Sequence, residues 1–251
     1  MAKPLVTFLR GGERWECGAV FVGRVFQVVD RLGGIMVATH SVQFLTIEDR
    51  NYPPLLRATA DPPAFLYARG DLSLLQAPCI ALVGTRRMSI YGKRVTGAFV
   101  PLLVRAGCIT VSGLAFGIDA EVARETLRCG GRTVAVLGHG LLHQVYPRAH
   151  TKLAEEMVRA GGLLLSEYPL DVPPAPHTFP ARNRIIAGLC RGTLVLEAPE
   201  KSGALITASF ALEEGREVFA VPGVIFDPNF AGCHGLIGRG EAKLVVSPRE
   251  V

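Results

Sequence analysis

The sequence predicts a doubly wound α/β protein with a mostly parallel sheet, and three observations support this. Hydrophobic residues make up 49% of the 251 residues, which is enough for a sizeable core. From about residue 78, short apolar runs alternate with helix-like stretches, as in parallel sheets covered by helices on both faces. Several of these runs end in glycine or serine, which are common where a strand gives way to a turn. We therefore expect an extended Rossmann-like domain.

The expected elements follow from these patterns. The stretch 92–106 is predicted to be a helix that Pro101 kinks or splits. Residues 51–63 carry four prolines and are predicted to be an extended connection. Residues 17–47 have mixed periodicity and could form a strand, a helix and a strand. The runs predicted to be strands are 79–84, 108–113, 132–138, 162–167, 192–198, 216–223 and 242–246.

The composition limits the class of protein. Lysine and arginine number 27 against 22 acids, a modest excess whose meaning depends on clustering. Six cysteines without a C-x-x-C pair indicate reduced thiols and not a disulfide framework or a zinc site. We find no signal peptide and no apolar run long enough to span a membrane, so a cytoplasmic protein is expected. We expect no cofactor and no metal.

The first candidate site follows the first predicted strand. In a doubly wound sheet, ligands bind beyond the carboxyl ends of the strands. Gly84, Thr85 and Arg86 lie there, and further bases follow up to Arg94 with no acid among them. Neither G-x-G-x-x-G nor a P-loop is present. The stretch is either an anion site or a solvated basic turn.

The second candidate site is "FPARNRIIAGL", residues 179–189. The basic cluster is expected at or just before a helix start, with Asn183 as a plausible N-cap. Phe179 could stack on a base of a single strand while Arg182 and Arg184 hold phosphates. The alternative is an ordinary capped helix with exposed arginines.

A third candidate site opens the helix after strand 192–198. Lys201, Ser202 and Gly203 place a cation, a hydroxyl and a glycine at a helix N-terminus, where anions bind. Each motif is weak alone. Three of them at strand ends of one sheet predict a site for a polyanion.

Catalytic candidates are weaker. His139 and His143 are four residues apart but lack the glutamate of H-E-x-x-H, so we expect them to be structural. Asp119, Glu167 and Glu197 lie near strand ends and could act in acid–base chemistry. Alternatively, Asp119 caps or starts the next helix, and the two glutamates order the arginines by ion pairing. We favour these structural roles and expect no catalytic residue.

With these motifs in order, the chain resembles the DNA-processing protein A (DprA/Smf) family from residue 49 to about 246. The shared stretches include "VGTRRMSIYG", "VSGLAFGIDAEV", "AVLGHGLLHQVYP" and "EKSGALITASFALEEGREVFAVPG". The resemblance implies a domain that binds single-stranded DNA, protects incoming strands in natural transformation and helps load the RecA recombinase. It also implies a homodimer. The DNA-binding residues it implies are Thr85, Arg86, Ser112, Gly113, Phe179, Arg182, Asn183, Arg184, Lys201, Ser202 and Gly203.

The chain departs from the family pattern at several positions. Phe116 stands where the family commonly has arginine, Ala123 where histidine is common, and Gly235 where a larger residue is usual. We expect an N-terminal region of uncertain structure, 1–47, a DNA-binding domain, 48–251, and no C-terminal winged-helix module.

The alternative function is that of a Rossmann-like hydrolase of nucleoside monophosphates. Those enzymes resemble "GGxGTxxE", whereas Phe210 occupies the glutamate position here. Without that carboxylate the general acid–base group is missing, so we expect a protein that is not an enzyme.

Overall fold

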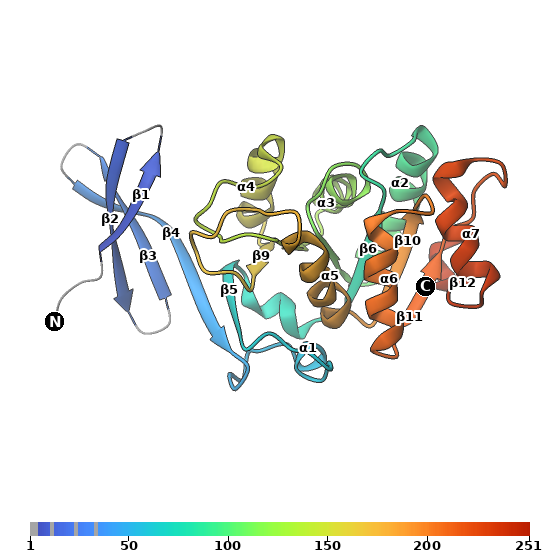
Figure 1. Ribbon diagram of the computed structural model, residues 1–251, viewed down its shortest axis with the longest axis horizontal. Coiled ribbons are helices and arrows are strands. Elements are labelled where there is room, and N and C mark those ends of the chain that lie inside the picture. The colour runs from blue at the N-terminus through green and yellow to red at the C-terminus, as the bar shows by residue number, and fades with distance from the viewer. Residues whose placement is uncertain (1–4, 11–12, 23–24, 33–34) are drawn as a thin grey trace.

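The structure is a computed structural model that describes the backbone of residues 5–10, 13–22, 25–32 and 35–251 (Figure 1). Side chains are described from residue 41 onward. The strands of these residues form one sheet in the order β1-β2-β3-β4-β5-β9-β8-β7-β6-β10-β11-β12. The α/β class predicted from the sequence is confirmed.

The parallel part of the sheet contains seven strands, each lying inside a predicted run. They are β6 (Cys79–Gly84), β7 (Ile109–Ser112), β8 (Thr133–Val136), β9 (Leu163–Ser166), β10 (Gly192–Glu197), β11 (Glu217–Ala220) and β12 (Lys243–Leu244). Strands β6 to β10 are almost wholly buried, as expected for a sheet covered on both faces. The strand order reverses between β6 and β10, which is the switch point of the doubly wound fold.

Helices cover both faces of the parallel strands (Figure 1). Ile80 and Leu82 pack in one cluster with Phe99 and Val122, whereas Ala81 and Val83 share another cluster with residues of α5 and α6. This alternation follows from the period of two along a strand. The first face carries α2 (Ile90–Arg105), α3 (Ile118–Arg128) and α4 (Thr151–Arg159). The second carries α1 (Pro54–Arg57), α5 (Thr178–Leu189), α6 (Gly203–Glu213) and α7 (Ala231–Gly238).

Helix α2 continues through Pro101 without a break, so the expected split does not occur. Proline removes one N–H from the helix, but the buried face formed by Phe99, Val100 and Leu103 still packs in the core. Tertiary packing therefore outweighs the lost hydrogen bond.

The N-terminal region differs from the expectation. The strands β1 (Leu5–Arg10), β2 (Glu13–Val22), β3 (Val25–Leu32) and β4 (Ile35–Thr46) form an antiparallel meander. The helix considered within 17–47 is therefore wrong, and the β-branched and aromatic residues of "VFQVV" explain why β3 is extended. Strand β5 (Phe65–Gly70) pairs antiparallel with both β4 and β9, and so joins this meander to the parallel strands.

Two further expectations concern the connection and the thiols. The segment 51–63 is not fully extended, because α1 begins at Pro54, where a missing N–H costs a helix nothing. The thiols of Cys79, Cys108, Cys129, Cys190 and Cys233 are free, and Cys17 lies outside the described side chains. Within the part of the chain that the structure describes, no helix is long and apolar enough to cross a bilayer.

Candidate nucleic-acid interface

A small pocket lies beyond the carboxyl ends of β6, β7 and β8, beside the start of α5. It brings together four predicted residues from three separate stretches of the chain. The space left at its centre is about 10 Å³, room for one water molecule. The lining residues are Arg86, Gly113, Ala115, Phe116, Tyr146, Pro147, Phe179 and Arg182.

Arg182 forms the floor of this pocket and is only 3% exposed. Its Nη1 donates to the carbonyl of Val136, while its Nε has no partner among the described residues. Burial lowers the pKa of Arg182 to about 10, and the charge of Asp119 opposes that shift. The buried guanidinium is thus only partly satisfied by the protein.

Asp119 is the counter-charge of Arg182. It lies in the first turn of α3, as one of our two readings expected, and accepts a hydrogen bond from the backbone N–H of Gly113 at 3.0 Å. Burial raises the pKa of Asp119, and the nearby guanidinium of Arg182 opposes this. Asp119 thus holds the backbone of Gly113 and lies beside the charge of Arg182.

Arg86 and Tyr146 both contact the ring of Phe179. The Arg86 guanidinium carbon lies 5.6 Å from the Phe179 ring centroid, and the Tyr146 centroid lies 5.2 Å from it at an interplanar angle of 37°. Arg86 is exposed, so its charge also faces solvent. The cluster offers a cation and aromatic surface side by side.

The N-terminus of α2 is already occupied by a carboxylate of the protein. Glu197, at the end of β10, is fully buried and accepts hydrogen bonds from the Ser89 N–H and hydroxyl at 3.1 and 3.2 Å. A side chain on Gly92 would overlap the same carboxylate. Glu197 thus binds Ser89, the N-cap residue of α2. Among the described residues it pairs with no arginine, contrary to the role we considered for it. An external anion at the first motif would therefore bind to the arginine side chains and not to the N-terminus of α2.

The second motif folds differently from the expectation. Helix α5 begins at Thr178, so Asn183 lies inside the helix and is not its N-cap. The Thr178 hydroxyl anchors the helix start between Gly138 and Ala175. Pro180 fits because the first turn of a helix needs no partner for its N–H groups. The Asn183 side chain donates to the carbonyl of Gly203 at 3.2 Å and ties α5 to the start of α6.

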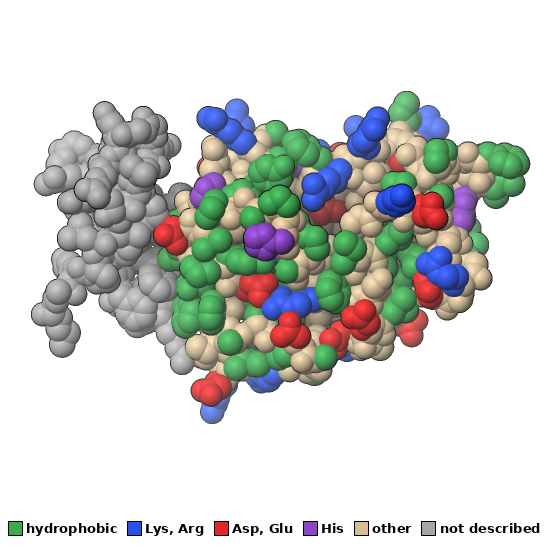
Figure 2. Space-filling model, viewed as in Figure 1, with side chains coloured by type: hydrophobic (Ala, Val, Ile, Leu, Met, Phe, Trp, Pro, Cys, Tyr) green, Lys and Arg blue, Asp and Glu red, His purple; other side chains and the backbone are tan. Residues whose placement is uncertain are grey.

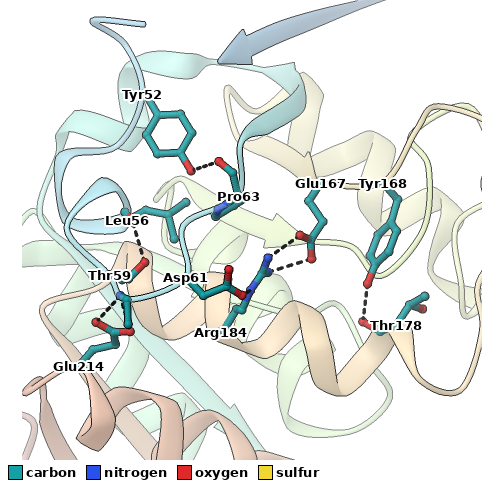
Figure 3. Close-up of polar contacts among 11 residues, drawn as sticks. Tyr52, Leu56, Thr59, Asp61, Pro63, Glu167, Tyr168, Thr178, Arg184 and Glu214 are labelled. Carbon is teal, nitrogen blue, oxygen red and sulfur yellow. Dashed lines mark hydrogen bonds and ion pairs between the residues drawn. The ribbon is translucent and has the colours of Figure 1, made fainter. Parts of the chain in front are cut away.

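Arg184 lies away from the pocket, in a cluster shown in Figure 3. Its two Nη atoms donate to both oxygens of Glu167 at 2.9 and 2.7 Å, and its Nε donates to Asp61 at 2.9 Å. Burial by itself lowers the pKa of Arg184, but the bonds to Glu167 and Asp61 outweigh it and raise that pKa. The ion pair expected for Glu167 is confirmed. The structure therefore separates Arg184 from Arg182, although they are two residues apart.

The third motif forms an open helix N-terminus. Ser202 is the N-cap of α6, and its hydroxyl accepts from the Ala204 N–H at 3.3 Å. Lys201 is exposed, and no atom lies within 4 Å of a Cβ built on Gly203. By contrast, Thr85 and Ser112 are buried beneath the surface. They can position the neighbouring loops but cannot reach far outward.

Sequence reasoning did not single out Tyr146 as a site residue. Its backbone N–H donates to Nε2 of the buried His139 at 3.1 Å, while His139 Nδ1 lies 3.0 Å from the carbonyl of Gly140. Because the carbonyl can only accept, Nδ1 carries a proton, and because Nε2 accepts from an N–H it carries none, so the ring is neutral. Burial lowers the pKa of His139 and maintains this state. These contacts of His139 hold the backbone of Tyr146 in place, and the structural role of this histidine stays a prediction.

Charge is distributed unevenly over the face with α5 and α6. Figure 2 shows lysine and arginine side chains along the upper border, whereas most of the acidic side chains lie lower down, where basic side chains are also present. The carboxyl edge of the parallel strands also carries exposed bases, which follow strand ends or open the helices after them. The exposed bases at helix starts and strand ends along this edge are Arg86, Arg87, Lys93, Arg94, Arg148, Lys152 and Lys201.

The fold and the site together define a Rossmann-like protein with a basic, aromatic-lined edge at its switch region. More specifically, the chain belongs to the DNA recombination-mediator protein A family, whose sequence profile matches residues 43–251. The family predicted from the sequence is confirmed.

Several relatives support this assignment. Protein Smf of Escherichia coli is 48% identical over 200 residues, which cover 80% of this chain and 53% of that protein. DNA processing protein DprA of Bacillus subtilis is 41% identical over 236 residues, covering 93% of this chain and 78% of the relative. The chain thus spans about half the length of the E. coli protein.

Two solved structures share the fold at substantial identity. DNA processing protein A of Streptococcus pneumoniae superposes with a TM-score of 0.77 at 44% identity, over 83% of this chain and 72% of that one. DNA processing protein A of Helicobacter pylori, described for its single-stranded DNA binding mode, gives a TM-score of 0.74 at 30% identity, over 83% of this chain and 93% of that one.

Proposed function

We propose that this chain binds single-stranded DNA along the carboxyl edge of its parallel strands and acts as a recombination mediator. The observation that carries the proposal is the convergence of Arg86, Gly113, Phe179 and Arg182 on one pocket. The single-stranded DNA binding described for the H. pylori relative supports it. Lys201 and the open start of α6 extend the basic surface beside this pocket.

The chemistry of the edge favours a single strand over a duplex. Exposed aromatic rings can stack only on unpaired bases, and arginines beside them can hold the intervening phosphates. We assign direct contact to Arg86, Arg182, Lys201 and the backbone at Gly113 and Gly203. Phe179 lines the pocket beside Arg86 and Arg182. Thr85, Ser112, Asn183 and Ser202 support the loops that carry these groups.

We also propose that the chain is not an enzyme. Phe210, in the position of the glutamate of related hydrolases, is partly buried and packs against the core. A phenyl ring cannot transfer a proton, so hydrolysis of a nucleotide has no acid–base group at that position.

Several parts of the proposal concern the whole protein in the cell. We propose that it works as a homodimer in the cytoplasm, protects incoming strands in natural transformation and recruits RecA to them. Two linked sites would strengthen binding by effective concentration without new contacts. Light scattering at micromolar concentration tests the dimer, and a pull-down with the cognate RecA tests the partner.

Within the chain, we propose that residues 48–251 form the DNA-binding domain.

The central experiment compares a fluorescent thymidine oligomer with a blunt duplex of equal length by anisotropy. We expect tighter binding of the single strand, with a log–log salt slope of about −0.7 per phosphate contact. Equal affinity for the two forms would overturn the proposal.

A further inference from the structure

Phe179 is the ring that the sequence marks for base stacking, yet its neighbours already cover much of it. Arg86 lies over the ring at 5.6 Å, and Tyr146 packs against it at 5.2 Å. The backbone of Thr178 and the ring itself also lie close to Gly138. Phe179 is only partly exposed as a result.

Two other aromatic residues of the same pocket are more accessible. Phe116 is 47% exposed and Tyr146 is 44% exposed. Phe116 is held by an edge contact with the buried His150, whose ring centroid lies 5.1 Å away. Tyr146 is held by its backbone bond to His139 and by its contact with Phe179. Each ring is thus held by contacts on one side and accessible to solvent on the other.

The pocket between these rings does not admit a base as it stands, because its free space of about 10 Å³ accommodates one water. A base of the strand must therefore meet the rings at the mouth of the pocket. There the rings can stack on a base while Arg86 and the partly satisfied Arg182 supply positive charge.

We propose that Phe116 and Tyr146 form the base-stacking platform of this protein and that Phe179 is the support beneath Tyr146. This inference rests on the proposed function and specifies which rings touch the strand. It also gives a role to the exposed ring of Phe116, which lines the same pocket as Arg86 and Arg182.

The test is a thermodynamic cycle between ring and base. The two oligomers have the same number of phosphates, but one carries thymine at every position and the other carries only abasic sites. The variants are Phe116→Leu and Tyr146→Leu, which keep apolar contacts but remove the ring. Each is expected to weaken binding of the thymidine oligomer by roughly five-fold or more. Each should change binding of the abasic oligomer by less than about two-fold, because phosphate contacts persist.

Conservative variants and a remote control sharpen the result. Tyr146→Phe and Phe116→Tyr keep a ring and should bind both oligomers like the parent. Leu212→Ala removes an exposed apolar side chain near the opposite end of α6 and should also bind like the parent. Thermal melting of each variant establishes that it is folded.

The outcomes separate the two proposals. If the parent chain fails to bind the thymidine oligomer, the proposed function fails. If the parent binds but the leucine variants bind the thymidine oligomer normally, or lose equal affinity for both oligomers, the stacking platform is wrong. A loss confined to the oligomer with bases supports it.

Discussion

The guanidinium of Arg182 occupies the space that a side chain on Gly113 would need. A Cβ built on Gly113 overlaps both Nη atoms and the central carbon of that group. The two residues come from the end of β7 and from α5, and Asp119 links them by accepting from the Gly113 N–H. The absence of a side chain at residue 113 is therefore a condition for the buried charge of the pocket.

This relationship predicts the effect of Gly113→Ala. The methyl group should displace Arg182 and lower the free energy of unfolding by about 1–3 kcal/mol, as overpacked sites do. Single-strand affinity should fall with it. Gly97→Ala is the matched control, because no atom lies within 4 Å of its Cβ inside α2, and it should stabilise by about 0.5–1 kcal/mol. Urea unfolding measures both, and an unchanged Gly113→Ala protein would contradict the prediction.

The proposed phosphate contacts predict a change in the salt dependence of DNA binding. Arg86→Ala and Lys201→Ala should each weaken binding to all sequences and reduce the log–log salt slope by about 0.7. Arg105→Ala removes an exposed arginine at the other end of α2, at the opposite edge of the sheet, and should leave the slope unchanged. Anisotropy titrations at several salt concentrations measure these slopes. Equal slopes in all four proteins would show that the basic edge is misplaced.

Arg184 is predicted to act in stability and not in DNA binding. Arg184→Leu leaves Glu167 without its bidentate partner and frees Asp61 from α5. Lost hydrogen bonds between charged groups of this kind cost about 1.5–3 kcal/mol of unfolding free energy. At a temperature where the variant is fully folded, its single-strand affinity and salt slope should match the parent. A reduced salt slope in this variant would indicate that Arg184 contacts DNA.

The His139–Tyr146 bond predicts a pH dependence. In the unfolded chain His139 takes up a proton near pH 6.5, whereas burial lowers its pKa in the folded protein. As pH falls below 6.5 the unfolded state therefore binds the extra proton first, and the free energy of unfolding decreases. Protonation would also remove the acceptor of the Tyr146 N–H, beside the positive charge of Arg182 and the ring of His143.

The measurement is urea unfolding at pH 7.5 and 5.5 for the parent and for His139→Gln. The glutamine cannot titrate, so the parent should lose more stability between the two pH values than this variant. The difference in pH response between the two proteins reports on His139, because Asp119 and Glu197 titrate in both of them. The raised pKa values of these two carboxyl groups increase the free energy of unfolding as pH falls, which is the opposite of the effect of His139. An equal pH response in both proteins would refute the prediction.

The chain is predicted not to hydrolyse nucleotides. Incubation with AMP or ATP should release neither base nor phosphate above the level of a Lys201→Ala control, because Phe210 cannot act as an acid or base. Chromatography of the products checks this. Steady release that depends on Lys201 would support the hydrolase instead.

The sequence by itself determined the strands of the parallel sheet and the family. Apolar runs such as 79–84 and 192–197 can be predicted as buried strands from their own residues, because a short continuous apolar run that ends in turn residues is typical of such a strand. The prediction does not require knowing which strand pairs with which. The Lys201-Ser202-Gly203 helix start is equally local, because an N-cap hydroxyl needs only the N–H groups of its own first turn.

Only the tertiary structure decided which charged groups face the proposed DNA site. Glu197 lies 108 residues from Ser89, and Arg184 lies 123 residues from Asp61. No local pattern therefore predicts that Glu197 binds the start of a helix or that Asp61 pairs with an arginine. In the same way, Tyr146 reaches Phe179 only because the loop after β8 folds over the start of α5. The role of a charged or aromatic side chain depends on the residues that surround it in space, and those residues come from segments that are distant in the sequence.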